Sequence, residues 1–78
     1  IDPTVAIGGC DSNVANQTLS DGHTFNDLIG LAAFNPKNHG DYVKKVSKLA
    51  NGWKKDGLIS GKDKGKITSC AAKSDIGK

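Results

Sequence analysis

The chain has 78 residues, of which 36% are hydrophobic, so it can form one small domain with a modest core. All 11 cationic side chains are lysine and all 8 anionic side chains are aspartate, which gives a formal net charge of +3. Because specific phosphate and base recognition depends on the planar fork of arginine, this composition argues against sequence-specific binding of nucleic acid. The length excludes a nucleotide-binding α/β domain or a barrel enzyme, and no apolar run approaches the roughly 20 residues of a membrane-spanning helix.

The charges are segregated along the chain. Residues 1–36 contain four aspartates and no lysine, a formal charge of −4, and residues 37–78 contain eleven lysines against four aspartates, a formal charge of +7. Two explanations remain open. The acidic part either lies against the basic part of the same molecule, or it attracts the basic part of a second copy, head to tail.

The sequence begins at Ile1 and contains no methionine. We therefore expect a mature product from which a secretory signal or a pro-segment was removed, and a secreted or extracytoplasmic location. Cys10 and Cys70 are the only cysteines and predict one intramolecular disulfide, with free thiols or pairing between chains as alternatives. Such a bridge would close a loop of roughly 60 residues and contribute about 4 kcal/mol in the chain-entropy model.

Residues 1–22 predict an irregular N-terminal arm, because turn-forming residues are too dense there for a long helix or strand. The short apolar patch from Val5 to Ile7 fits either a brief strand or an extended arm laid on the helices. Val5 and Ile7 are therefore the candidate contact residues of this arm. Residues 23–78 are expected to form a helical domain, and the two parts together make a single domain.

The first expected helix follows Thr24, which with Asp27 three residues later resembles a capping box. An apolar stripe at i, i+3, i+4 and i+7 then comprises Phe25, Leu28, Ile29 and Ala32. Leu31 and Phe34 lie off this stripe, which predicts that the helix is buried on more than one side. The pair Asn35-Pro36 ends the helix, because proline disfavours the helical conformation of the residue before it.

The second expected helix has the clearest pattern, with an N-cap at Asn35-Pro36 or at Asn38 and a stop at Gly57. Its apolar arc comprises Tyr42, Val43, Val46, Leu49, Ala50 and Trp53. The lysines outside this arc form a candidate interaction surface, namely Lys44, Lys45, Lys48, Lys54 and Lys55. The arc either packs in the core while the lysines face solvent, or inserts into an anionic membrane surface.

A short extended link at Leu58-Ile59 precedes the third expected helix, for which Ser60 and Asp63 supply the start signal. This helix is expected to end near residue 72. One of its faces carries Ile67, Cys70 and Ala71. The sequence thus predicts an all-α fold of three short helices with an irregular N-terminal arm, closed by one disulfide.

Two patterns suggest metal binding but are better explained by local structure. The segment 56–63 resembles the second half of an EF-hand loop, although the first ligand positions fall on a glycine and a lysine. His23 with Asp21, and His39 with Asp41, are each spaced i, i+2, which points the two side chains of a helical pair in different directions. We therefore expect no metal and no other cofactor.

The chain offers little for catalysis, because it has no glutamate, no evident pair of carboxylates and two cysteines that are expected to be oxidised. The lysine-rich segment 61–66 lacks the spacing of a phosphate-binding loop and fits the solvated first turn of a helix. We therefore expect no catalytic residue, no small-molecule substrate and no enzymatic activity.

Two segments of the chain resemble a known group of proteins. They are Lys37-Asn38-His39-Gly40-Asp41-Tyr42-Val43 and Gly57-Leu58-Ile59-Ser60. Over residues 20–78 the chain resembles small exported bacterial helical domains of unknown function, which have a K-N-H-G-x-[YF]-V segment and a later G-[LI]-I-[ST] segment. The resemblance implies an exported, helical, disulfide-linked protein and nothing catalytic.

These patterns together favour a non-enzymatic extracytoplasmic protein that acts through its surface. It would be an interaction module or the structural subunit of an assembly, so its partner would be another protein or a second copy. The alternative is a cationic membrane-active protein, which would place the lysines of the second helix at an anionic membrane surface.

Overall fold

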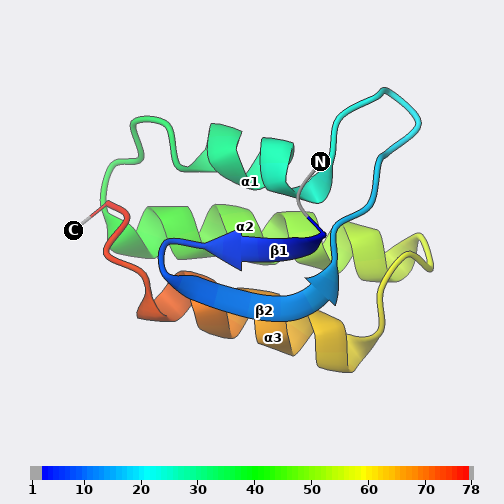
Figure 1. The fold of residues 1–78 in the computed structure, drawn as a ribbon. Coiled ribbons are helices and arrows are strands. Elements are labelled where there is room, and N and C mark those ends of the chain that lie inside the picture. The colour runs from blue at the N-terminus through cyan, green and yellow to red at the C-terminus, as the bar shows by residue number, and fades with distance from the viewer. Residues whose placement is uncertain (1–2, 78) are drawn as a thin grey trace.

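The computed structural model describes residues 3–77, in which two strands are followed by three helices (Figure 1). The elements in chain order are β1 (Thr4–Ile7), β2 (Cys10–Ala15), α1 (Phe25–Ala32), α2 (His39–Lys55) and α3 (Gly61–Lys73). The two strands form an antiparallel sheet. The fold is therefore α+β, and the all-α prediction is wrong because the N-terminal segment is not an irregular arm.

The hairpin β1–β2 occupies much of the segment that was expected to be irregular. Its loop is Gly8-Gly9, and Gly8 has a φ of 59°, in the left-handed region that two-residue hairpin loops require. Ile7 pairs with Cys10 directly across this loop. The turn-forming residues therefore mark a tight turn between two strands.

One face of the hairpin is buried against the helices. Val5, Ile7 and Val14 are at most 3% exposed, and Ser12 lies on the same buried face. The hydroxyl of Ser12 donates a 2.7 Å hydrogen bond to the carbonyl oxygen of Val5, so this buried polar group is paired. Because β2 contributes only one large apolar residue to the core, its strand pattern is weak in the sequence.

The start of α1 agrees with the prediction. Thr24 is the N-cap, and its hydroxyl accepts from the backbone N–H of Asp27 while the carboxylate of Asp27 accepts from the backbone N–H of Thr24. α1 directs Phe25 and Ile29 into the core. Past the end of α1, Asn35 adopts a left-handed φ of 55° before the proline.

The helix α2 begins after Asn38, whose side-chain oxygen accepts a 2.8 Å hydrogen bond from the backbone N–H of Asp41. Gly57 has a φ of 79°, which allows the chain to turn away just after the helix ends. The buried residues of α2 are Tyr42, Val46, Ala50 and Trp53. The apolar arc of this helix therefore packs in the core, as the first of its two interpretations predicted.

The helix α3 begins with the predicted capping box of Ser60 and Asp63. Its buried face consists of Ile67, Cys70 and Ala71. The disulfide between Cys10 and Cys70 is confirmed, with Cα atoms 5.5 Å apart and a sequence separation of 60 residues. It ties the first residue of β2 to the last turns of α3.

The segment after α3 returns to the start of α2. The imidazole of His39 lies between two backbone carbonyl oxygens, with Nδ1 2.8 Å from that of Ile76 and Nε2 3.1 Å from that of Ala72. Gly77 approaches the backbone of Asn38 so closely that a Cβ there would lie 2.7 Å from its carbonyl carbon and oxygen. Only glycine fits at this position, which also has a φ of 84°.

The hairpin packs on α3 through both of its strands and on α1 through β1, while α1 packs beside α2 on the side away from α3 (Figure 1). The aromatic rings of Phe25 and Trp53 stack where α1 meets α2. The core comprises Val5, Ile7, Val14, Phe25, Ile29, Tyr42, Val46, Ala50, Trp53, Ile59, Ile67, Cys70 and Ala71. No helix within residues 3–77 has both the length and the apolarity to cross a bilayer.

Candidate interaction surface

An open, mostly apolar hollow of about 470 Å³ lies on the surface between α1 and α2. It is called the α1–α2 groove here. Its lining residues are Leu28, Leu31 and Ala32 of α1, and Lys45, Lys48 and Leu49 of α2. The groove therefore has one uncharged wall and one wall that carries two cations.

The two walls of the α1–α2 groove have the same helical spacing. The α1 residues stand at i, i+3 and i+4 counted from Leu28, and the α2 residues stand at i, i+3 and i+4 counted from Lys45. Side chains at these spacings are neighbours on one face of a helix. Each helix therefore presents about one turn of its surface to the groove.

Two large apolar side chains at this end of α1 are exposed. Leu31 lines the groove and is 64% exposed, and Phe34, two residues beyond the helix, is 81% exposed. The prediction that these residues give α1 a second buried side is wrong within the single chain. Because α1 packs against α2 and β1 but not against α3, nothing in the described part of the chain covers that side.

The five lysines predicted as an interaction surface are all exposed, but the structure does not gather them at one place. Only Lys45 and Lys48 line the α1–α2 groove. Lys45 Nζ also lies 3.3 Å from a carboxylate oxygen of Asp41, one helical turn earlier. The backbone N–H of Lys37 and, secondarily, the ammonium of Lys45 hold the pKa of Asp41 below its usual value.

A second hollow, also about 470 Å³, lies between β2 and α3. Lys62, Lys66 and Lys73 line it from α3, and Asp11 lines it from β2. The three lysines stand at i, i+4 and i+11, a helical spacing that could have revealed this face in the sequence. The carboxylate of Asp11 accepts a 2.9 Å hydrogen bond from the backbone N–H of Asn13, which lowers the pKa of Asp11, as does a hydrogen bond with the side chain of Thr4.

Val5 and Ile7, the candidate contact residues of the N-terminal arm, lie in the core of the chain itself. Val5 is 0% and Ile7 is 2% exposed. Their strand β1 pairs with β2 and packs against α1 and α3. These two side chains are therefore not part of the molecular surface.

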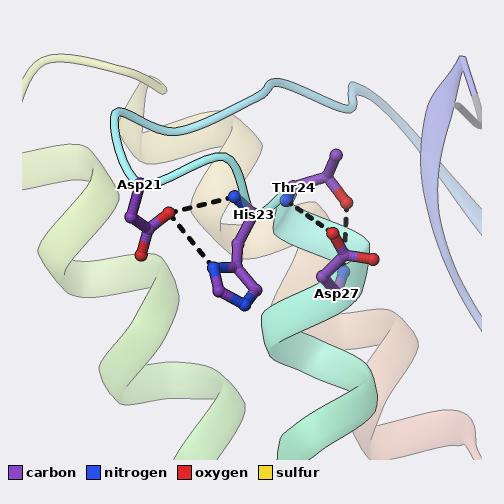
Figure 2. Close-up of polar contacts among 4 residues, drawn as sticks. All are labelled: Asp21, His23, Thr24 and Asp27. Carbon is purple, nitrogen blue, oxygen red and sulfur yellow. Dashed lines mark hydrogen bonds and ion pairs between the residues drawn. The ribbon is translucent and has the colours of Figure 1, made fainter.

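The acidic and imidazole groups before α1 and in its first turn take part in local structure (Figure 2). A carboxylate oxygen of Asp21 accepts from the backbone N–H of His23 at 3.0 Å and lies 3.3 Å from Nδ1 of the same ring. The backbone N–H of His23 is the main cause that lowers the pKa of Asp21. Asp27 is engaged with Thr24 in the capping box. Each carboxylate therefore serves a turn or a helix start.

The two histidines have different environments. His23 lies in the exposed turn before α1, whereas His39 holds the segment after α3 against α2. Within residues 3–77, no three histidine, cysteine, aspartate or glutamate side chains gather in a group that could hold a metal ion. The interactions of both histidines are those of structural residues.

No family model matches the chain, and no similar curated protein or solved structure is found. Its function is therefore inferred from the chemistry of its surfaces. Among these, the α1–α2 groove is lined by Leu31, which is 64% exposed, whereas Leu58, which lines a different hollow with Leu19 and Trp53, is 36% exposed.

Proposed function

We propose that this chain is a non-enzymatic extracytoplasmic interaction module that binds a protein partner in the α1–α2 groove. One observation carries the proposal: Leu31 in the groove and Phe34 beside the same end of α1 are 64% and 81% exposed. Large apolar side chains that are exposed at neighbouring positions, as these two are at i and i+3, are typical of an interaction site on a folded protein. The two lysines of the α2 wall add selectivity for a partner with acidic groups.

The extracytoplasmic part of the proposal is supported by the disulfide. The bridge Cys10–Cys70 is compatible with an extracellular location, because disulfides persist where the surroundings are oxidising. The bridge also joins two elements that both contribute to the core, so a reducing compartment would weaken the fold.

A different protein is a better partner than a second copy. Head-to-tail association would require the acidic N-terminal part of one copy to meet the basic helices of another. Asp11, however, lines the same hollow as Lys62, Lys66 and Lys73 of its own chain, so part of the opposite charge is already neutralised within the molecule.

The test is a selection of peptides from a random display library on the immobilised protein. Binders are then compared on three proteins: the unmodified chain, Leu31→Ser, and Leu58→Ser as the matched control. Leu58 is an exposed leucine that does not line the groove. We expect affinity to fall at least about tenfold for Leu31→Ser and to stay unchanged for Leu58→Ser.

Two other occupants are distinguished in the same study. Light scattering after size exclusion would show a mass above one chain if a second copy filled the groove. Leakage of anionic vesicles that is lost in Leu31→Ser would indicate a membrane surface instead. Either result, or peptides that bind Leu31→Ser as tightly as the unmodified chain, would contradict the proposal.

A further inference from the structure

The geometry points to an amphipathic α-helix as the form of the partner, with apolar side chains in the α1–α2 groove and acidic side chains along the wall formed by α2. This inference rests on the proposed function and specifies the class of ligand that it takes. Three independent properties of the groove support it.

The first property is the shape of the walls. Both walls are helix surfaces with residues at i, i+3 and i+4, starting at Leu28 on α1 and at Lys45 on α2. Rows of side chains at these spacings form the ridges and grooves through which helices pack on one another. A helix of the partner that lies between α1 and α2 would therefore meet a surface with the same spacing of side chains as its own.

The second property is the absence of main-chain partners in the lining. The groove residues belong to α1 and α2, and their side chains end in methyl groups or ammonium groups. Both walls are helices, in which interior backbone groups are hydrogen-bonded within the helix and the last-turn carbonyl groups form no ladder. An extended peptide would therefore find no strand edge to pair with. A helix satisfies its own backbone and buries only side chains, so it loses no hydrogen bonds on docking.

The third property is the distribution of charge. Both cations of the lining, Lys45 and Lys48, stand on the α2 wall, while the α1 wall is uncharged. Lys45 is already paired with Asp41, and the structure gives Lys48 no ion pair within residues 3–77. Acidic residues along one flank of the partner helix would therefore meet Lys48 first, which fixes the side on which that flank lies.

The length of α1 limits the length of the partner. An α-helix rises about 1.5 Å per residue, so the eight residues of α1 span roughly 12 Å. A partner helix of about three turns covers this length. Isolated helices of that size are marginal in water, so the partner would gain helical structure as it binds.

The test uses a synthetic peptide of about 14 residues, with leucines at i, i+3, i+4 and i+7 and glutamates along one flank. A scrambled peptide of the same composition lacks this periodicity, and a third peptide has lysine in place of each glutamate. Calorimetry measures affinity, circular dichroism measures helix gain, and amide chemical shifts locate the site. We expect the periodic acidic peptide to bind at least about tenfold more tightly than either control, with a gain of helix.

A pair of variants tests the charge of the α2 wall. Lys48→Glu reverses the charge in the groove, and Lys55→Glu makes the same change on the same helix outside it. We expect the first to weaken binding of the acidic peptide by about tenfold and the second to leave it unchanged. Binding of the lysine-substituted peptide should improve only in Lys48→Glu.

The outcomes separate this inference from the proposed function. If display-selected peptides depend on Leu31 but show no helical periodicity and gain no helix, the groove binds a partner and the helical form is wrong. If no peptide of any form depends on Leu31, the proposed function itself fails. Equal affinity for the periodic and the scrambled peptide also overturns the helical form.

Discussion

The phenyl ring of Phe25 stacks on the indole ring of Trp53, with ring centroids 4.0 Å apart and an interplanar angle of 19°. The contact joins the first residue of α1 to the last turns of α2, so it anchors the helix that forms the uncharged wall of the α1–α2 groove. Stacked aromatic pairs stabilise by about 0.5–1.5 kcal/mol beyond the burial of their area.

Replacing Phe25 should therefore detach α1 as well as weaken the core. We expect Phe25→Ala to lower the free energy of unfolding by about 3–5 kcal/mol, a large part of the total for a domain of this size. Phe25→Leu keeps most of the volume and should lose less. Urea unfolding followed by the fluorescence of Trp53, the only tryptophan, measures both; equal losses for the two variants would contradict the role of the ring.

The hydroxyl of Tyr42 is buried and has no hydrogen-bond partner within residues 3–77, although the residue is 0% exposed. A buried polar group without a partner costs roughly 1–3 kcal/mol. Tyr42→Phe should therefore leave the free energy of unfolding unchanged or raise it by about 1 kcal/mol. Thermal and urea unfolding test this prediction. A loss beyond about 1 kcal/mol would mean that the hydroxyl has a favourable partner.

The same tyrosine predicts a loss of stability at alkaline pH. Burial raises the pKa of Tyr42 above its ordinary value of 10.0, so the folded state keeps the phenolic proton to higher pH than the unfolded state does. Its contribution is fully present below pH 10.0 and is lost as the pH rises through the folded-state pKa. The free energy of unfolding is measured against pH for the unmodified chain and for Tyr42→Phe. Lysine titration affects both proteins, whereas only the unmodified chain should show the loss that comes from Tyr42.

The disulfide should account for a large share of the stability. Replacing both Cys10 and Cys70 by serine removes a covalent loop of 60 residues, and we expect a loss of about 4 kcal/mol in the free energy of unfolding. Urea unfolding of the double variant, with the reduced unmodified chain as its control, measures the loss. Stability unchanged in both would show that the hairpin is held on α3 by packing alone.

Gly77 should be far less tolerant of substitution than Gly57, although both have left-handed φ values, 84° and 79°. A Cβ at Gly77 would overlap the backbone of Asn38, whereas a Cβ at Gly57 meets nothing within 4 Å. Both alanine variants bear the conformational cost, of order 1 kcal/mol. We expect Gly77→Ala also to release the contacts of His39 with the segment after α3. Amide exchange near Ile76 should rise in Gly77→Ala alone, and similar exchange in both variants would argue against the overlap.

The three helices could be predicted because their signals are local. Capping residues such as Thr24 and Ser60, and apolar residues at helical spacing, act within a few positions of one another. The hairpin could not be predicted in the same way. Its strand β2 has a serine on the buried face, and that buried hydroxyl is tolerated because it donates a hydrogen bond to the carbonyl oxygen of Val5.

The α1–α2 groove depends on tertiary structure, so the sequence could not indicate it. Leu31 lies off the buried stripe of α1, which is equally consistent with a second buried side or with an exposed one. The difference is decided by whether another element packs against that side of α1. In this chain α3 does not contact α1, and the hairpin reaches α1 only through β1. The lysines gave a similarly incomplete signal, because only two of the five line the groove.

The bridge between Cys10 and Cys70 also determines what a protease can do to this molecule. The connections at residues 16–24, 33–38 and 56–60 all lie between the two cysteines, so each belongs to the covalent ring that the bridge closes. One cut in any of them opens the ring and releases no fragment. A nicked chain thus keeps both walls of its groove on one covalently connected molecule, and it separates into pieces only when the bridge is reduced as well.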